Sequence, residues 1–368
     1  MHCPISGDDL HQIVSMGRQP IFMGTTTSNK EADQFNEMNW GATKNGVIHL
    51  MSRIPLDVLY SQSHNSGLIG GTWKKHHIHF SEFISTYSPK NICEIGGGHG
   101  ILSQNYAKLK DFSSWDIYEP NAKKSPDSRV TIHSEFFHEN TRLDKKDCIL
   151  HSHLFEHLYD HSAVLKKIHH SLTDKGVMIF SLPNMEQMIK NGYVNALNFE
   201  HVTYLPEDLI EFLLKKNGFV IDRKDYFLED HSIFYACKKT SNPQIAEYKN
   251  TKHIDDIISF FATEKTKVDD LNSLLSLHYK QSNVFLFGAH IFSQFYLTNG
   301  LDNSLIKAVL DNDPEKQQQR LYGTNLKVAS PTIVANIEDA VVLVRAGAYQ
   351  DEIVAQLNAI NPCVEILL

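Results

Sequence analysis

The chain has 368 residues, more than one typical domain holds, so we expect two or three domains. Its hydrophobic share of 42% and charged share of 21% are ordinary for a globular protein and argue against long disordered segments. A net charge of −8 without a basic run disfavours nucleic acid as the main partner, and no run approaches the roughly 18 consecutive apolar residues of a membrane helix.

The first residues, Met1 to Pro4, carry neither the basic nor the apolar region of a secretory signal, so we expect none. Five cysteines are scattered along the chain, at positions 3, 93, 148, 237 and 363. No two of them have the spacing of zinc ligands, and together they do not form the pattern of a disulfide framework. A reducing, cytoplasmic location is therefore the simplest expectation.

Residues 1–75 are poorly periodic and contain turn signals such as Ser6-Gly7 and Asn45-Gly46. From Ser81 onward, short apolar runs alternate with helical patterns. The expected strands include 92–95, 115–118, 148–150, 177–181 and 234–237, and the expected helices include 162–172 and 206–217. This alternation predicts an α/β fold with a mostly parallel sheet covered by helices on both faces.

A linker pattern at Ser241-Asn242-Pro243 precedes a second α/β unit. A polar, helix-favouring segment at about 245–280 opens this unit, and strand-like runs follow at 284–287, 307–310, 341–344 and 364–367. We therefore expect three domains: a small irregular N-terminal domain at 1–75, a central α/β domain at 76–240, and a smaller α/β domain at 241–368.

The strongest single motif is the buried run Ile92 to Ile95, which enters a glycine-rich turn before a helix begins at Ile101. Glycine is needed where the backbone turns sharply and approaches a ligand closely; the glycines expected to do so are Gly96, Gly98 and Gly100. Several nucleotide-binding folds share such a loop, so the loop alone does not identify the ligand. Two carboxylates add information. Glu94 lies in the strand before the loop, and Glu119, which ends the next strand, can accept both ribose hydroxyls of an adenosine.

The position of Glu94 separates two kinds of cofactor. A pyrophosphate-binding loop avoids a nearby carboxylate because anions repel, whereas S-adenosylmethionine carries a sulfonium and an ammonium cation that a carboxylate favours. The glycine loop between Glu94 and Glu119 resembles the cofactor motifs of class I S-adenosylmethionine-dependent methyltransferases, over about residues 81–239. The resemblance implies their Rossmann-like sheet and further cofactor contacts from Glu135, Phe136 and His153.

Three further stretches narrow the resemblance. The run from Phe199 to Tyr204, which reads FEHVTY, resembles the Glu-His-x-x-Tyr core of nucleotide-sugar C-methyltransferases. The runs from Asp313 to Gln317 and from Gly347 to Ile353 resemble the C-terminal Rossmann-like domain of that family. The family joins this domain to a small N-terminal zinc-binding domain and a methyltransferase core. Its members methylate a ring carbon of a nucleotide-linked keto-deoxysugar.

The chain departs from the family in two places. The family binds zinc through two C-x2-C pairs in the N-terminal domain, but here Cys3 stands alone and Ser6 occupies the second position. One thiolate cannot make a closed tetrahedral site, so we expect no metal and a domain held by packing. The family also has Tyr-His where this chain has Asn198-Phe199, which leaves the methylated atom open.

Methylation of a carbon next to a ketone needs a base for the α-proton and a donor for the enolate oxygen. His201 is the expected base, because an unperturbed imidazole titrates near neutrality. Glu200 would orient it or hold a sugar hydroxyl, and Tyr204 would donate to the oxyanion. His157, after the fourth strand, would take a catalytic or substrate-binding role.

The resemblance thus implies an enzyme that binds S-adenosylmethionine and a nucleotide sugar, with Tyr60 and Asn198 contacting the sugar. The Gly288-Ala289-His290 turn lacks full dinucleotide-loop spacing, so the C-terminal unit is expected to be a scaffold or a substrate clamp. Two alternatives stay open. One is an O- or N-methyltransferase acting on a sugar or small metabolite. The other is a non-catalytic relative that binds S-adenosylmethionine or only a partner protein.

Overall fold

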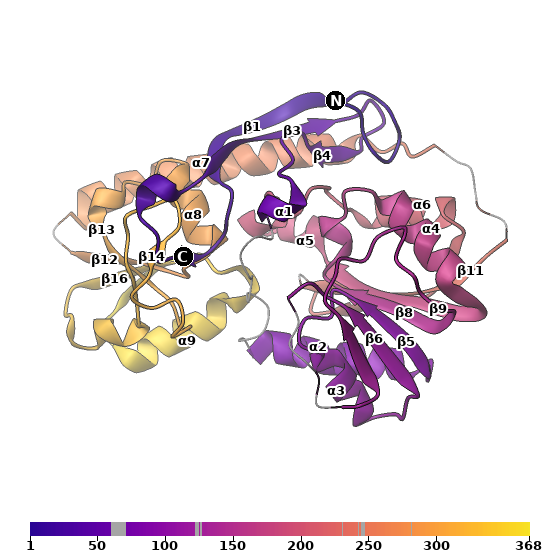
Figure 1. Cartoon of the computed structure of the whole chain (residues 1–368). Helices are drawn as coiled ribbons and strands as arrows, with labels where there is room; N and C mark the ends of the chain where they lie inside the picture. The colour runs from indigo at the N-terminus through magenta and orange to yellow at the C-terminus, as the bar shows by residue number, and fades with distance from the viewer. Residues whose placement is uncertain are drawn as a thin grey trace.

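The computed structural model describes residues 1–59, 71–121, 125, 127–229, 231–241, 243, 247–280 and 282–368. The strands of these residues form one seven-stranded sheet, one five-stranded sheet, one three-stranded sheet and a two-stranded pairing. The seven-stranded and five-stranded sheets lie at opposite ends of the molecule, and the N-terminal strands lie across the top of both in the view of Figure 1. Among the described helices, none is both long and apolar enough to cross a membrane.

The N-terminal segment forms an antiparallel sheet of β1 (His11–Pro20), β3 (Phe35–Ala42) and β4 (Ile48–Leu50). Its core includes the fully buried side chain of Trp40. The pairing of β1 with β3 has two irregularities in register, which break the alternation of inward and outward residues. This explains why the segment looked aperiodic in the sequence although much of it is strand.

The seven-stranded sheet has the order β10-β11-β9-β8-β5-β6-β7. Its strands are β5 (Asn91–Ile95), β6 (Ser114–Tyr118), β7 (Val130–His133), β8 (Lys146–Ser152), β9 (Leu172–Pro183), β10 (Phe219–Phe227) and β11 (Ser232–Lys239). The strands from β5 to β9 are parallel, whereas β11 runs antiparallel to both β9 and β10. The sheet is therefore mixed, and the carboxyl ends of its parallel strands share one edge.

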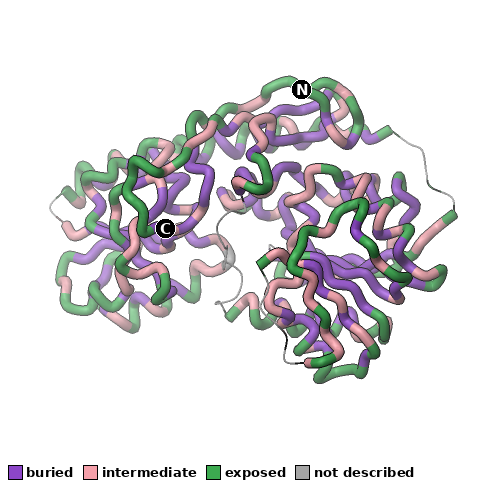
Figure 2. Tube along the Cα trace, in the orientation of Figure 1, coloured by how far each residue is buried: buried purple, intermediate pink, exposed green. Residues whose placement is uncertain are grey.

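Helices cover both faces of this sheet, as Figure 1 shows. On one face lie α2 (Gly71–Ser85) and α3 (Ile101–Ala107), and on the other α4 (His161–Ser171) and α6 (Glu207–Lys216). The strands between them are buried along most of their length (Figure 2), and the apolar side chains of the two faces belong to separate clusters. The short helices α1 (Leu56–Leu59) and α5 (Met185–Lys190) lie beside the sheet, near the N-terminal strands.

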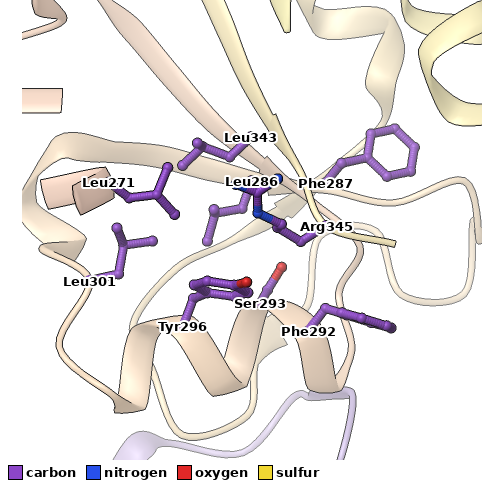
Figure 3. A pocket seen from close by; sticks show the side chains of 9 residues that line it. All are labelled: Leu271, Leu286, Phe287, Phe292, Ser293, Tyr296, Leu301, Leu343 and Arg345. Carbon is purple, nitrogen blue, oxygen red and sulfur yellow. The ribbon is translucent and has the colours of Figure 1, made fainter. Parts of the chain in front are cut away.

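The C-terminal unit begins with the long helix α7 (Lys252–His278), which runs along β1 in Figure 1. Its parallel sheet has the order β15-β13-β12-β16-β17. The elements are β12 (Asn283–Phe287), α8 (Ile291–Thr298), β13 (Ile306–Leu310), β14 (Arg320–Leu321), β15 (Val328–Ala329), β16 (Ala340–Val344), α9 (Gln350–Ile360) and β17 (Glu365–Leu367). A small pocket between α7, α8 and the sheet is lined mostly by apolar side chains (Figure 3) and lies wholly within this unit.

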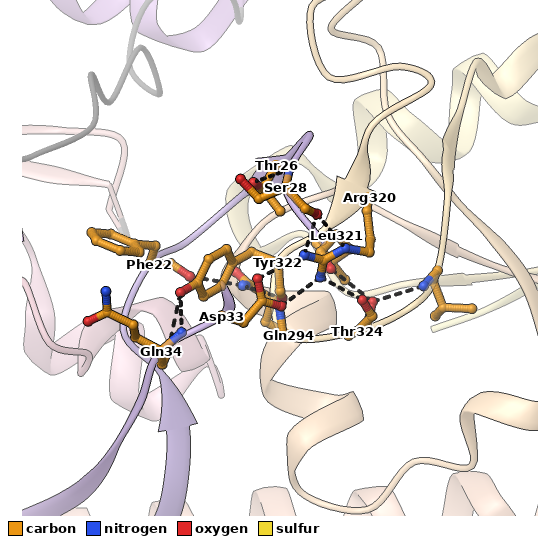
Figure 4. Close-up of polar contacts among 12 residues, drawn as sticks. Phe22, Thr26, Ser28, Asp33, Gln34, Gln294, Arg320, Leu321, Tyr322 and Thr324 are labelled. Atoms are coloured by element: carbon orange, nitrogen blue, oxygen red, sulfur yellow. Dashed lines mark hydrogen bonds and ion pairs between the residues drawn. The ribbon is translucent and has the colours of Figure 1, made fainter. Parts of the chain in front are cut away.

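The N-terminal segment is attached to the C-terminal unit by buried polar contacts (Figure 4). Strand β2 (Thr25–Thr26) pairs with β14, and the carboxylate of Asp33 accepts two bonds from the Arg320 guanidinium, at 2.6 and 2.8 Å. The backbone N–H of Gly323 donates to the same carboxylate at 2.8 Å. The side chain of Asp33 is only 1% exposed and that of Arg320 is 12% exposed, so this bidentate ion pair is largely buried.

The same N-terminal segment also contacts the central unit. The backbone N–H of Leu50 donates to the carbonyl of Val202, and the N–H of Tyr204 donates to the carbonyl of Ile48. The loop after α5 is thereby held as an extended segment against the edge of β4. This loop carries the Glu200-His201 pair.

Candidate active site

The glycine loop joins β5 to α3 at the carboxyl edge of the sheet. Gly96, Gly98 and Gly100 have φ angles of +72°, +52° and +73°, in the left-handed region that glycine adopts without strain. A side chain placed on Gly98 would meet no atom within 4 Å, so the space over the middle of the loop is open. The loop therefore presents backbone to an open space, as a ligand-binding turn requires.

Glu94 lies beneath this loop, with only 3% of its surface exposed. Its carboxylate accepts a hydrogen bond of 2.8 Å from Nε1 of Trp115. A Cβ on Gly97 would lie 2.6 Å from the Glu94 carboxyl carbon, so glycine at this position makes room for the acid. Burial raises the pKa of Glu94 to about 8, and a ligand cation placed above the carboxyl would favour the ionised form.

The next two strands end at the same edge. Glu119 follows β6 directly, is partly exposed, and accepts the N–H of Asn121 at 3.2 Å through one carboxylate oxygen. Glu135 and Phe136 follow β7 and are exposed, with Phe136 at 48%. A buried carboxyl under an open glycine loop, then an accessible carboxylate, then an accessible aromatic ring fit a ligand with a cationic amino-acid end and an adenosine end. S-adenosylmethionine has both.

A group of acidic and imidazole side chains, the base cluster, lies beyond the end of β8. It consists of Glu156, His157, Glu200 and His201. The His157 ring lies 3.9 Å from Glu156 through Nε2 and 3.9 Å from Glu200 through Nδ1, and its centroid is 4.9 Å from that of His201. The structure thus brings together three residues expected from the sequence, and it adds Glu156.

Glu156 is fully buried, and neither of its carboxylate oxygens has a hydrogen-bond partner among the described residues. Burial by itself raises the pKa of this carboxyl, but the neighbouring imidazoles, His153 first, outweigh burial and lower the pKa to about 2. An ionised carboxylate therefore stands among three imidazoles. It can stabilise positive charge that develops on any of them.

The tautomer of His201 follows from its surroundings. Nδ1 lies 3.1 Å from the carbonyl oxygen of Ala196, which can only accept, so Nδ1 carries the proton and Nε2 carries the lone pair. Burial lowers the pKa of His201 to about 4, which keeps the ring neutral and able to accept a proton. Asn198 is buried, and its side-chain oxygen accepts the N–H groups of Glu200 and His201 at 2.7 and 3.0 Å. The structure thus uses Asn198 to shape the loop that positions His201, whereas the sequence analysis expected it to contact the sugar.

Of two other predicted residues, one lies elsewhere. Tyr204 is buried with its ring 5.6 Å from that of His253 in α7, so the structure does not bring it to the base cluster. The cause is the extended segment pairing with β4, because residues three apart in such a segment point to opposite sides. Tyr60 lies outside the described residues.

His153 was expected to contact the cofactor, but the structure places it in a second cluster with His76 of α2 and His231 before β11. The indole of Trp73 packs against all three rings, at centroid distances between 4.8 and 5.1 Å. Sequence reasoning gave no role to His76, His231 or Glu156. No spacing rule could join positions 76, 153 and 231, whereas Glu156 lies next to the predicted His157 and could have been considered with it.

Comparison with protein families gives two matches that together span most of the chain. Residues 75–224 match a methyltransferase domain, and residues 247–363 match the C-methyltransferase C-terminal domain. A search of curated proteins found no match.

Three solved structures are similar to part of this chain. One is the N-methyltransferase NodS from Bradyrhizobium japonicum, with 11% identity, coverage of 47% of this chain and 99% of that chain, and a TM-score of 0.36. Another is an S-adenosylmethionine-dependent methyltransferase from Mesorhizobium loti, with 12% identity, coverage of 41% of this chain and 91% of that chain, and a TM-score of 0.35. The third is an S-adenosylmethionine-dependent methyltransferase from Leishmania major, with 17% identity, coverage of 48% of this chain and 77% of that chain, and a TM-score of 0.38.

Proposed function

We propose that this chain, a member of the family of S-adenosylmethionine-dependent sugar C-methyltransferases, methylates a ring carbon of a nucleotide-linked keto-deoxysugar. The observation that carries the proposal is His201, a neutral imidazole with its Nε2 lone pair available, beside the buried carboxylate of Glu156. A sugar carbon needs such a base to lose its α-proton, whereas the sulfonium of the donor is already reactive and needs no base.

The residues of the chain divide the work as follows. S-adenosylmethionine would supply an electrophilic methyl group, which the enolate carbon takes as the methyl–sulfur bond breaks and its electron pair stays on the sulfur of S-adenosylhomocysteine. His201 Nε2 takes the α-proton from the sugar carbon, and the electron pair of that C–H bond passes into an enolate. Glu156 stabilises the imidazolium that forms. His157 donates a hydrogen bond to the enolate oxygen, and Glu200 holds a sugar hydroxyl.

We also propose that residues 1–75, 76–240 and 241–368 act as three domains, with the donor bound by the second. A contact supports a clamping role for the third: the phenol of Tyr349 interacts with the side chain of Trp73, which covers the histidines of the central unit. The C-terminal unit therefore reaches the neighbourhood of the site rather than standing apart from it.

Proton exchange tests the proposal without methyl transfer. With S-adenosylhomocysteine bound, the parent enzyme should exchange the sugar's α-proton with deuterated water, as mass spectrometry or NMR would show. His201→Asn should slow exchange and methylation by at least about 100-fold while keeping affinity for S-adenosylhomocysteine. His170→Asn, an exposed histidine of α4, is the matched control and should change neither.

One result would replace the proposal. If the parent enzyme methylates a sugar hydroxyl or amine and catalyses no exchange, the chain is an O- or N-methyltransferase. Normal turnover in a folded His201→Asn variant would remove His201 from the mechanism.

A further inference from the structure

The second cluster has the composition of a metal site. His76, His153 and His231 come from three separate parts of the chain: helix α2, the end of β8, and the turn before β11. One ring nitrogen from each lies within 4.8 Å of the others. Three imidazoles are a recurring ligand set for zinc and neighbouring transition metals.

The cluster is buried, and part of its hydrogen-bonding capacity is unused. His76 is 0% exposed, and its Nδ1 has no hydrogen-bond partner among the described residues. A buried polar nitrogen without a hydrogen-bond partner is unfavourable, so such an atom next to two other imidazoles points to a ligand.

The surroundings of His153 match those of a metal-binding histidine. Its Nδ1 lies 3.4 Å from the buried Glu156 carboxylate, while Nε2, on the other side of the ring, lies 2.8 Å from the hydroxyl of Ser232. A histidine that binds a metal through one nitrogen usually points the other at a carboxylate or carbonyl, which fixes the tautomer. Glu156 would also offset part of the charge of a bound cation.

We propose that His76, His153 and His231 bind a divalent transition-metal ion, with zinc as the first candidate. Zinc–nitrogen bonds of about 2.0–2.1 Å place tetrahedral ligand atoms about 3.4 Å apart, so the longest separation must shorten by no more than about 1.4 Å. Rotation of the histidine rings and of Ser232, whose hydroxyl also lies 2.6 Å from His231 Nδ1, supplies that movement.

Three protein ligands leave a coordination position for water or for an oxygen of the methyl acceptor. Only the binding of an acceptor oxygen to the ion rests on the proposed function. Glu156 contacts both His153 and His157, so the ion lies next to the base cluster.

This site differs from the one that the sequence analysis considered and rejected. Among the described residues, Cys3 belongs to no group of three possible ligands. Glu156, His157 and His201 form the other such group, but their geometry is accounted for by the proton transfer proposed above.

The test uses the full chain without a histidine tag, stripped of metal by a chelator and titrated with Zn²⁺ against a chromophoric competitor. No methyl donor or acceptor is added, so failure here and failure of the proposed function are distinguishable. The parent should bind one Zn²⁺ per chain at this site, and Co²⁺ should give the visible absorption of a four-coordinate ion.

Replacing each ligand by Asn should weaken binding by at least about 100-fold, and Glu156→Gln should weaken it about 10- to 100-fold. His79→Asn is the matched control, because His79 is an exposed histidine of the same helix, and it should bind like the parent. If the variant at His76 fails to fold, the Zn²⁺ affinity of the variant at His231 tests the site instead, because His231 lies at the sheet edge and is 8% exposed.

Three results would overturn the site. The first is that the parent binds no stoichiometric Zn²⁺. The second is that the folded ligand variants bind Zn²⁺ as tightly as the parent. The third is that His157→Asn loses the ion while the variant at His231 keeps it. The last result would place the ion in the base cluster.

Discussion

Replacing Glu94 by Gln separates the shape of the buried carboxyl from its charge. The amide keeps the size of the side chain and can still accept the hydrogen bond from Trp115, but it cannot exchange a proton. Burial raises the pKa of Glu94 to about 8 in the parent protein, so the group is largely protonated at neutral pH. A ligand that presents a cation to this carboxyl lowers its pKa, and binding must therefore release a proton.

The expected size follows from linkage. With a pKa of about 8, about 0.9 of the ligand-free molecules carry the Glu94 proton at pH 7. If the complex holds the ionised form, the affinity for S-adenosylhomocysteine rises about 9-fold between pH 6 and 7 and about 50-fold between pH 6 and 8. Glu94→Gln loses this dependence, and at pH 8 it binds about 1.5–3 kcal/mol more weakly because a charged hydrogen bond is missing.

Calorimetry at several pH values, in two buffers with different ionisation enthalpies, counts the protons released. The Gln variant corrects for titration of the ligand's own amine, so the difference between the two proteins belongs to Glu94. Equal proton release in both would refute the assignment of Glu94 to the cationic end of the cofactor.

The same raised pKa affects the stability of the ligand-free protein. Because the folded pKa lies above the unfolded value of 4.5, the favourable contribution of the protonated form is complete below about pH 4.5 and is lost as the pH rises through about 8. The shift corresponds to roughly 5 kcal/mol as an upper bound. The melting temperature of the ligand-free parent should therefore fall relative to that of Glu94→Gln as the pH rises from 5 to 8.

Two further predictions concern the fold and the cofactor. Asp33→Asn leaves the largely buried Arg320 guanidinium without its carboxylate. It should lower the free energy of unfolding by about 3–5 kcal/mol and the melting temperature by several degrees in calorimetry. Asp225→Asn breaks an exposed pair and should lower the free energy of unfolding by less than about 1 kcal/mol. Equal melting temperatures for these two variants would contradict the anchoring role of Asp33. Glu119→Ala should weaken S-adenosylhomocysteine about 5- to 150-fold, and unchanged binding in a folded variant would remove Glu119 from the ribose site.

The sequence predicted best the elements whose signals are local. The run at 92–95 became β5 (Asn91–Ile95), and the helix expected at 206–217 became α6 (Glu207–Lys216), because a glycine loop and a proline mark their ends. Strand β10 was missed for a physical reason. It is an edge strand that carries a charged run from Asp222 to Asp225, which protects the edge but reads as a loop.

The site was predictable only where one strand and its loop define it. Glu94, the glycines and Glu119 lie at strand ends, so their meeting at one edge follows from parallel topology. His76 and His231 meet His153 only through the packing of α2 and the antiparallel β11 against the sheet. For Tyr204 the motif predicted a place in the site that the structure does not give it. Its backbone pairs with β4, which no sequence motif indicates, and this pairing directs its side chain to α7.

The two buried carboxyls of the central unit are prepared for different partners. Glu94 has no cationic neighbour among the described residues, and burial holds its pKa near 8, so its charge appears only when a ligand brings a cation. Glu156 is buried as completely, yet the surrounding imidazoles hold its pKa near 2, so its charge is present before any ligand arrives. Two acids whose surroundings give them such different pKa values take different roles in one site. Glu94 therefore suits recognition of the cationic donor, and Glu156 suits support of the histidines that handle the proton.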